Sequence, residues 1–460
     1  MQTKREKTII LLILLTATIL SPLDFYIVNL ALTPIQQSIE ASPSQLQMIV
    51  SFYACGFAVF QITGGRLGDQ LGRKRIFMTG LMGFIISSAI CGAAHIPQIL
   101  ILGRVLQGIS GAIMAPQILA IIHTLFSEEE KTKVMALYSF TFGIAAVLGQ
   151  ILGGVLISMD ILGLGWRTIF LINLPIGLLA FIGAAYLIPK IKSSEKGKTD
   201  VWGIVLFSAF LTLIVYPLTQ VGEQGWTNSI LLTLACSVLF LLLFVVHENR
   251  VVKQGETPLI DMEVFKYKNL SVGAIVAFLF YSSGVFFLAL GVYLQESAGL
   301  STLNAGAAII PFGIGFMLSS LLAPIITKYL DNRILNLGLF SFGMGFGLLI
   351  LALNYSSEPG LLFYTALFVC GLGMGTTLSS IVRISLVGIA HRFAGLAAGV
   401  INSALQIGSA IGVAALGSLF FSQGAEQGFT VAFTSVLTAL IVIVLLACVI
   451  AFTITQKQKK

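Results

Sequence analysis

Charged side chains are scarce in this chain. They make up 10% of its 460 residues, against about 25% in an average soluble domain, whereas hydrophobic residues make up 57%. This composition excludes an ordinary soluble protein. Cysteine is also scarce, and no two cysteines have the spacing of a metal site. All five fall inside apolar runs, so we expect small packing residues, with no disulfide and no bound metal, at Cys55, Cys91, Cys236, Cys370 and Cys448.

Histidine is rarer still, and its placement argues against a relay of imidazoles. The four histidines lie in loops or at the ends of apolar runs, at His95, His123, His247 and His391. No segment resembles a phosphate-binding loop or a hydrolytic triad. We therefore expect neither an enzyme nor an ATP-driven pump, and no cofactor.

Apolar runs long enough to cross a bilayer as a helix recur along the whole chain. None shows the alternating pattern of a membrane β-barrel strand. The first run carries Asp24 and is too long for the core of a cleaved signal peptide, so we expect it to remain in the protein. We count fourteen runs: 8–32, 45–64, 76–94, 97–121, 134–158, 167–189, 201–220, 227–246, 270–292, 303–327, 335–354, 361–385, 393–420 and 430–454.

The positive charges are confined to alternate loops. With the N-terminus in the cytoplasm, all but two of the 26 Lys and Arg residues fall in inner segments, as the positive-inside rule requires. The exceptions are Arg104 and Arg167. One missed span would invert the pattern downstream, so it supports fourteen transmembrane helices with both termini cytoplasmic. The net charge of +7 thus reflects topology. We expect a multi-pass protein of a bacterial plasma membrane that binds no nucleic acid.

Two charged residues are predicted to lie deep inside spans, Asp24 in the first and Arg104 in the fourth. Asp24 lies about eight residues before the outer end of its span, and Arg104 about seven after the outer start of its own. At about 1.5 Å per residue, both sit roughly 10–12 Å below the outer boundary. A charge in hydrocarbon is costly and by default marks a functional site. Equal depth permits an ion pair if the two helices are neighbours.

A glycine-rich loop joins the second and third spans and reads GGRLGDQLGRKRIF. Its glycines permit a tight turn, and its basic cluster holds the loop in the cytoplasm. This G-x-L-x-D-x-x-G-R-K-R string resembles the loop motif of the major facilitator superfamily. The resemblance implies a conformational-switch loop formed by Gly65, Asp69, Gly72, Arg73, Lys74 and Arg75.

Further segments resemble the fourteen-span drug:proton antiporters of that superfamily. They are LDFYIVNLAL, LILGRVLQGISGA, WRTIFLINLPIGLL, TPLIDMEVFKYKN and AGLAAGVINSALQIGSAIGVA. The likeness implies an all-α integral membrane fold of two six-helix bundles around a central cavity, plus two inserted helices. Long polar interruptions on either side of the seventh and eighth spans agree with it. We therefore expect an N-terminal bundle at 1–190, a linker with two extra helices at 191–268, and a C-terminal bundle at 269–460.

The fifth span departs from the family pattern. The antiporter motif normally reads G-P-x-x-G-G, but here Gln150 follows Gly149 in the place of the proline. Glutamine removes a kink and adds a polar side chain at membrane depth. An uncoupled facilitator therefore stays open as an alternative to an antiporter.

The resemblance implies export of lipophilic compounds in exchange for protons by alternating access. Burial favours the protonated form of a carboxyl group, whereas a neighbouring Arg favours its ionised form. A conformational change that parts Asp24 from Arg104 would therefore raise the proton affinity of Asp24. We expect Asp24 to carry the coupling proton and Arg104 to modulate it. The alternative is a permanent ion pair that joins the two spans.

A single deep carboxylate restricts the substrate. A divalent cation would favour two or more acidic groups, so we expect neutral, zwitterionic or monovalent lipophilic molecules. Aromatic residues and stripes of small and polar residues suit either a cavity wall or helix packing. The candidates for the cavity are Tyr26, Gln61, Gln107, Tyr138, Gln150, Asn402 and Gln406.

Two other functions stay open. A transporter of the same fold dedicated to one lipid, siderophore or metabolite would share these sequence features. A non-transporting membrane sensor would carry long soluble appendages, whereas the loops here are mostly brief. We expect a monomer whose partners are the lipid bilayer, protons and a small-molecule substrate.

Overall fold

The structure, a computed structural model, describes residues 4–190, 199–356 and 358–455. Within these ranges the chain is all-helical and contains no strand. Thirteen helical segments there are long and apolar enough to cross a membrane. One of them, Thr302–Tyr355, turns at the 3-10 segment η5 (Asp331–Arg333) and so holds two of the expected spans. The helices are therefore consistent with the fourteen spans expected.

The first six expected spans are seven helices, in which a short α6 precedes α7. Serine capping boxes begin α2 and α5, each with its side chain bonded to the backbone N–H three residues on. The first helix continues through Pro22, whose missing N–H weakens it beside Asp24. The bounds are α1 (Lys4–Ile39), α2 (Pro43–Leu71), α3 (Arg73–Gly92), α4 (Pro97–Leu125), α5 (Glu128–Ser158), α6 (Thr168–Leu171) and α7 (Asn173–Leu187).

The last six expected spans contain more breaks. The ninth is interrupted in its middle by η4 (Ser282–Gly284), and the tenth is divided at Ile309. The bounds are η3 (Met262–Lys266), α10 (Lys268–Tyr281), α11 (Val285–Glu296), α12 (Thr302–Ala308), α13 (Ile310–Leu330), α14 (Ile334–Tyr355), α15 (Leu361–Ser385), α16 (Ala394–Gln427) and α17 (Phe429–Thr455).

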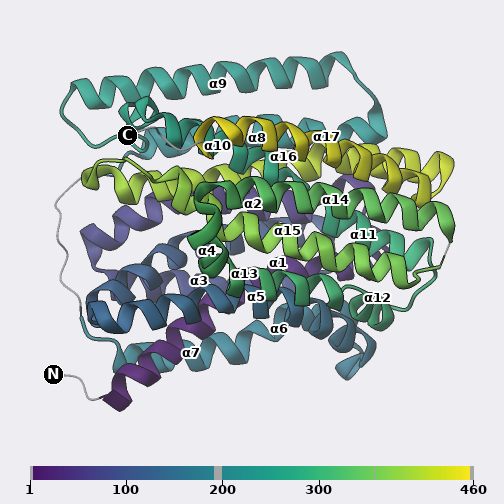
Figure 1. The fold of residues 1–460 in the computed structure, drawn as a ribbon, viewed down its shortest axis with the longest axis horizontal. Helices are drawn as coiled ribbons and strands as arrows, with labels where there is room; N and C mark the ends of the chain where they lie inside the picture. Colours follow the sequence, from purple (N-terminus) through teal and green to yellow (C-terminus); the bar gives the residue numbers. More distant parts are fainter. Residues whose placement is uncertain (1–3, 191–198, 357, 456–460) are drawn as a thin grey trace.

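The seventh and eighth expected spans are α8 (Val201–Gln224) and α9 (Asn228–Lys253). The α8 helix packs against α2 and α16: the Ser418 hydroxyl donates to the Leu218 carbonyl at 2.6 Å, and Glu223 accepts from the Ser44 amide at 2.8 Å. In turn α9 packs on α8 and runs along one edge of the molecule (Figure 1). Residues 191–198, at the start of the expected linker, lie outside the described residues. The division into two bundles and an inserted pair stays a prediction.

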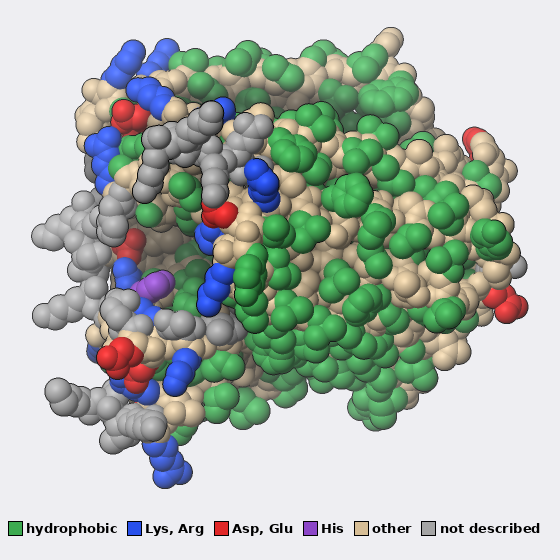
Figure 2. All heavy atoms as spheres, viewed as in Figure 1, with side chains coloured by type: hydrophobic (Ala, Val, Ile, Leu, Met, Phe, Trp, Pro, Cys, Tyr) green, Lys and Arg blue, Asp and Glu red, His purple; other side chains and the backbone are tan. Residues whose placement is uncertain are grey.

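The charges are arranged as a membrane requires. Lys and Arg gather at one edge of the molecule, and the visible sides are largely hydrophobic (Figure 2). The molecule is hollowed at the basic edge. The start of α1 and the end of α17 both lie there (Figure 1). The chain is a multi-pass membrane protein, and by the positive-inside rule this basic edge faces the cytoplasm.

Backbone contact between α2 and α4 positions the deep arginine. A Cβ added to Gly108 would lie 2.1 Å from the Tyr53 carbonyl oxygen, and one added to Gly56 would lie 2.8 Å from the Val105 carbonyl oxygen. Only glycine allows helices to approach so closely. Arg104 lies one turn before Gly108 and is thereby pressed against α2.

Candidate functional site

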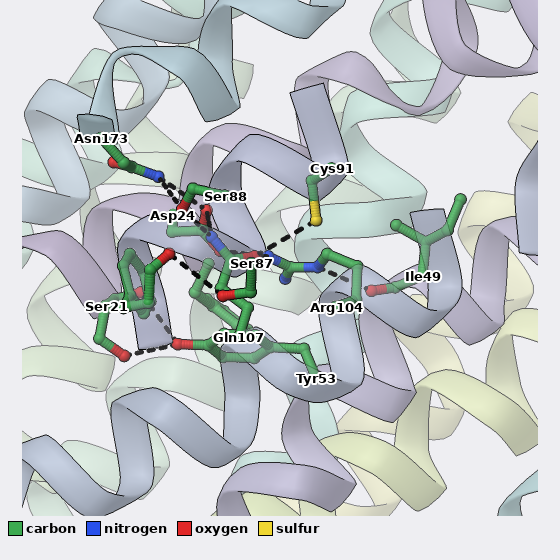
Figure 3. A network of polar contacts seen from close by, with 12 residues as sticks. Ser21, Asp24, Ile49, Tyr53, Ser87, Ser88, Cys91, Arg104, Gln107 and Asn173 are labelled. Carbon is green, nitrogen blue, oxygen red and sulfur yellow. Dashed lines mark hydrogen bonds and ion pairs between the residues drawn. The ribbon is translucent and has the colours of Figure 1, made fainter. Parts of the chain in front are cut away.

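The structure places Asp24 and Arg104 in contact. Nη1 of Arg104 on α4 donates to Oδ2 of Asp24 on α1, and both side chains are fully buried (Figure 3). A charge removed from water is expensive unless it is paired and hydrogen-bonded. The surrounding residues should therefore supply further bonds to both partners.

Amide side chains from α4 and α7 complete the bonding of Asp24. Its Oδ1 accepts from Nε2 of Gln107 at 2.8 Å and from Nδ2 of Asn173 at 3.3 Å. Both amides also donate to the Ser88 hydroxyl, at 2.9 and 3.3 Å (Figure 3). The ion pair thus joins α1, α3, α4 and α7 through one buried network.

Arg104 is held from the other side by α2. Its Nε donates to the Ile49 carbonyl at 3.0 Å, and Nη1 donates to Oε1 of Gln107 at 2.7 Å. Its guanidinium carbon lies 4.3 Å from the centre of the Tyr53 ring. This separation is typical of a cation–π contact, which is strongest when water is excluded.

Tyr53 connects this network to a cavity. Its hydroxyl is hydrogen-bonded to the Ser21 hydroxyl, and it also donates to the Ser21 carbonyl at 3.4 Å (Figure 3). Both Ser21 and Tyr53 line the cavity. The tyrosine therefore contacts Arg104 with its ring and forms part of the cavity wall.

The cavity is aromatic and uncharged. Its volume is about 170 Å³, and helices from both expected bundles line it. No Asp, Glu, Lys, Arg or His occurs among the described residues of its wall. The aromatic residues that line it are Phe25, Tyr26, Tyr53, Phe57, Tyr138, Phe142, Tyr281 and Phe316, and the polar ones include Thr18, Ser21, Gln61, Asn402 and Gln406.

Five of the seven residues predicted for the cavity line it, namely Tyr26, Gln61, Tyr138, Asn402 and Gln406. The structure places the other two elsewhere. Gln107 belongs to the network around Asp24, because it lies one turn from Arg104 on the same face of α4. Gln150 is buried in α5, where neither atom of its side-chain amide has a hydrogen-bond partner among the described residues.

The outer ends of the helices close the molecule above the cavity. A Cβ added to Gly291 of α11 would lie 2.7 Å from the Asn29 carbonyl oxygen of α1. One added to Gly306 of α12 would lie 2.6 Å from the Gln150 carbonyl oxygen of α5. Nε2 of Gln295 also donates to the Leu30 carbonyl at 3.1 Å. Segments far apart in the sequence are thus in backbone contact at the outer side.

The glycine-rich loop ties inner helix ends together. Gly72 has a φ of 96°, which lets the chain turn at once from α2 into α3. Arg73 donates to Asp69 at 3.2 Å, to the Ala120 carbonyl at 3.0 Å and to the Thr124 hydroxyl at 2.8 Å. The loop is thereby attached to α4.

The other predicted loop residues differ in their surroundings. Nζ of Lys74 donates to the Ala185 carbonyl at 2.7 Å, which attaches the loop to α7. A Cβ added to Gly65 would lie 3.9 Å from Pro116, an ordinary contact. Arg75 is exposed.

Three residues of the network were missed by the sequence analysis: Tyr53, Ser88 and Asn173. Asn173 offered a signal, because an amide inside an apolar span is itself a candidate for a functional contact. Tyr53 and Ser88 gave no such signal, because tyrosine and serine are ordinary residue types in membrane helices. Their importance depends on how α2 and α3 are rotated toward Arg104.

Comparisons with known proteins agree with this architecture. The model of the Major Facilitator Superfamily matches residues 14–413. A probable actinorhodin transporter of Streptomyces coelicolor is 34% identical over 422 residues, and the match covers 90% of this chain and 72% of that protein. The puromycin resistance protein pur8 of Streptomyces alboniger is 32% identical, with 91% and 82% covered.

A solved structure shows the likeness of fold. It is a bacterial homologue of the human lysosomal transporter Spinster, in an inward-facing and unoccupied conformation. It aligns with a TM-score of 0.66 over 99% of this chain and 98% of that chain, at 16% identity. The chain belongs to the major facilitator superfamily and is a membrane transporter, not an enzyme, with relatives named as antibiotic transport and resistance proteins.

Proposed function

We propose that the protein is a proton-coupled exporter of lipophilic, neutral or singly charged small molecules that works by alternating access. One observation carries the proposal: the buried Asp24–Arg104 pair lies directly behind Tyr53, which lines the aromatic cavity. A proton site and a substrate site that share one side chain have a physical means of affecting each other.

The coupling follows from the contacts of Arg104. A proton on Asp24 neutralises the carboxylate and weakens its bond to the guanidinium. A substrate that packs on Tyr53 from the cavity side changes the position of the ring on which the guanidinium lies. Proton and substrate therefore act on the same cation from opposite sides, and binding of one lowers the affinity for the other.

The cavity wall sets the chemistry of the substrate. Aromatic rings favour flat or lipophilic molecules, and the amides of Gln61, Asn402 and Gln406 offer hydrogen bonds. A dication would lack a compensating carboxylate in this wall, and burying it would be costly. Preferential export of a dication over monocations would contradict the proposal.

We interpret this conformation as one that is closed toward the outside. The contacts of Gly291 and Gly306 close the outer ends, and the cavity is lined by residues of the middle and inner halves of the helices, such as Ser21 and Pro116. We propose that substrate enters from the cytoplasm in this state. The loop around Arg73 would then hold the inner ends of α2, α3 and α4 together as the bundles move.

The test is transport in proteoliposomes with and without an imposed pH gradient, using a panel of lipophilic compounds. Asp24→Asn is expected to lose accumulation driven by the gradient while it retains downhill exchange of the same substrate. The matched control is Asp160→Asn, which changes the same functional group in an outer turn, where the amide oxygen can still accept from the Gly165 N–H. Unchanged gradient-driven accumulation by Asp24→Asn would refute the proposal.

A dedicated metabolite exporter is the second candidate. It is favoured by relatives whose names specify single compounds, actinorhodin and puromycin. Transport of one compound from the panel, with no transport of the others, would support this reading. Substrate transport without any proton flux would instead indicate an uncoupled facilitator.

A further inference from the structure

A second cluster of polar side chains lies far from the cavity, where the inserted helices meet at their cytoplasmic ends. Asp200 caps the start of α8, and His247 and Glu248 lie near the end of α9. One ligand-type atom from each of the three lies within 4.8 Å of the others. Because 47 residues separate Asp200 from His247, no short spacing in the sequence pointed to this cluster.

Backbone amides fix the orientation of both carboxylates. Oδ1 of Asp200 accepts from the Gly203 N–H at 2.8 Å, and Oδ2 accepts from the Leu259 N–H at 3.3 Å. Oε2 of Glu248 accepts from the Ile260 N–H at 2.8 Å. Oriented carboxylates of this kind are typical of metal ligands, whose outer partners hold them in place.

The imidazole completes the set. Nε2 of His247 lies 2.8 Å from Oδ1 of Asp200. Oδ1 of Asp200 thus contacts both the imidazole and the Gly203 amide, which holds the ring of His247 against the carboxylate.

One carboxylate oxygen in the cluster has no donor. Glu248 is fully buried, and its Oε1 lacks a hydrogen-bond partner among the described residues. A Cβ added to Gly203 would lie 2.5 Å from this oxygen and 2.6 Å from Oδ2 of Asp200, so the two acceptors converge on one point. Arg66 is the cation that interacts electrostatically with Glu248. Oε1 of Glu248 and Oδ2 of Asp200 therefore offer two oxygens that one ion could share.

We propose that Asp200, His247 and Glu248 bind a first-row transition-metal dication of the Zn²⁺ type. Such ions take imidazole nitrogen and carboxylate oxygen at about 2.0–2.2 Å, which in a tetrahedral site places adjacent donor atoms about 3.3–3.6 Å apart. Nε2 and Oδ1 are 2.8 Å apart, at hydrogen-bond distance, so the two atoms would separate by less than about 1 Å to share an ion. The imidazole disfavours Mg²⁺ and Ca²⁺, which prefer oxygen ligands throughout. Binding replaces the proton on Nε2 with the metal.

A metal at this point would join three segments of the chain: the start of α8, the end of α9, and the bend at 259–260 that leads into η3 and α10. The α8 helix in turn contacts both α2 and α16. The ion would therefore stabilise the attachment of the inserted pair, and it would do so whether or not the proposed proton coupling is correct.

The test measures metal binding by the full chain in detergent, purified without a polyhistidine tag and stripped with a chelator. Titration with Zn²⁺ in a calorimeter, and with Co²⁺ followed by its visible absorption, is expected to show one ion per chain with a micromolar or tighter Kd. Zn²⁺ is also expected to raise the thermal midpoint of the wild-type protein. Absence of stoichiometric binding by the wild type would overturn the proposal.

Two variants locate the ion. His247→Gln keeps an N–H donor for Asp200 but removes the imidazole, and should weaken Zn²⁺ binding at least about tenfold. Glu248→Gln should do the same. The matched control is His123→Ala, which removes an exposed histidine at the inner end of α4 and should bind as the wild type does. Equal affinity in His247→Gln and in the wild type would place the ion elsewhere and refute the assignment, as would loss of binding in His123→Ala alone.

Discussion

Removing one partner of the Asp24–Arg104 pair should destabilise the protein at least as much as removing both. Asp24→Asn leaves the guanidinium buried without its carboxylate, and Arg104→Met leaves the carboxylate without its cation. Each change is expected to cost about 3–5 kcal/mol, because both side chains are fully buried. Arg104→Met also loses the bond to the Ile49 carbonyl, which is worth about 1.5–3 kcal/mol because its donor is charged.

The double variant Asp24→Asn/Arg104→Met contains no buried charge at this place. It should be no less stable than either single variant, which corresponds to a coupling free energy of about 3–5 kcal/mol. The assay is equilibrium unfolding in mixed detergent micelles, followed by tryptophan fluorescence. The matched control is the pair Lys7–Glu130, which is 2.8 Å apart but partly exposed. Its coupling is expected to be far smaller, because water screens a partly exposed pair. Additive effects of Asp24→Asn and Arg104→Met would refute the contact.

Three other changes test separate contacts. Gly108→Val should separate α2 from α4 and lower the free energy of unfolding by at least about 3 kcal/mol, because a Cβ would lie 2.1 Å from the Tyr53 carbonyl oxygen. The control Gly347→Ala, with open space around it, should leave the free energy of unfolding unchanged or higher. Gln150→Leu removes an amide that has no partner among the described residues, so it should stabilise the outward-closed state by about 1–3 kcal/mol. We expect a higher thermal midpoint and slower transport, and a lower midpoint would contradict this. Tyr53→Phe keeps the ring over Arg104 and should move as many protons per substrate as the wild type, whereas Tyr53→Leu loses a contact worth about 0.5–2 kcal/mol and should move fewer. Equal proton flux in both variants would exclude the ring as the connection between the ion pair and the cavity.

The helical spans and their sidedness could be read from the sequence because each depends on local composition. Apolar length marks a membrane helix, and loop charge marks its inner end, so both can be read without knowing how the helices pack. The same reasoning placed Asp24 and Arg104 at one depth, and the structure has them in contact. The break at Ser282–Gly284 was not expected, since neither serine nor glycine is rare within membrane helices.

The partners of the deep pair could be predicted only in part. Gln107 was expected in the cavity wall but bonds to Asp24 and Arg104, and its place one turn after Arg104 on the same face of α4 explains why. Tyr53 could not be found in this way, because its place over the guanidinium depends on how α2 is rotated. That rotation follows from the backbone contact at Gly108, which is a property of two helices together. The depth of a residue in the membrane can thus be predicted from one span, whereas the neighbour that its side chain contacts depends on how two spans pack.

In the proposed mechanism, the position of Tyr53 between the ion pair and the cavity would allow one protein to export compounds of different size. The proposed proton site at Asp24 is not part of the cavity wall, so a bulky substrate and a small one would leave the same space for the proton. Selectivity would then depend on whether the substrate reaches the Tyr53 ring, and less on its overall shape. A wide range of substrates and a constant number of protons moved per substrate would then be compatible, because the substrate contacts one face of Tyr53 and the ion pair contacts the other.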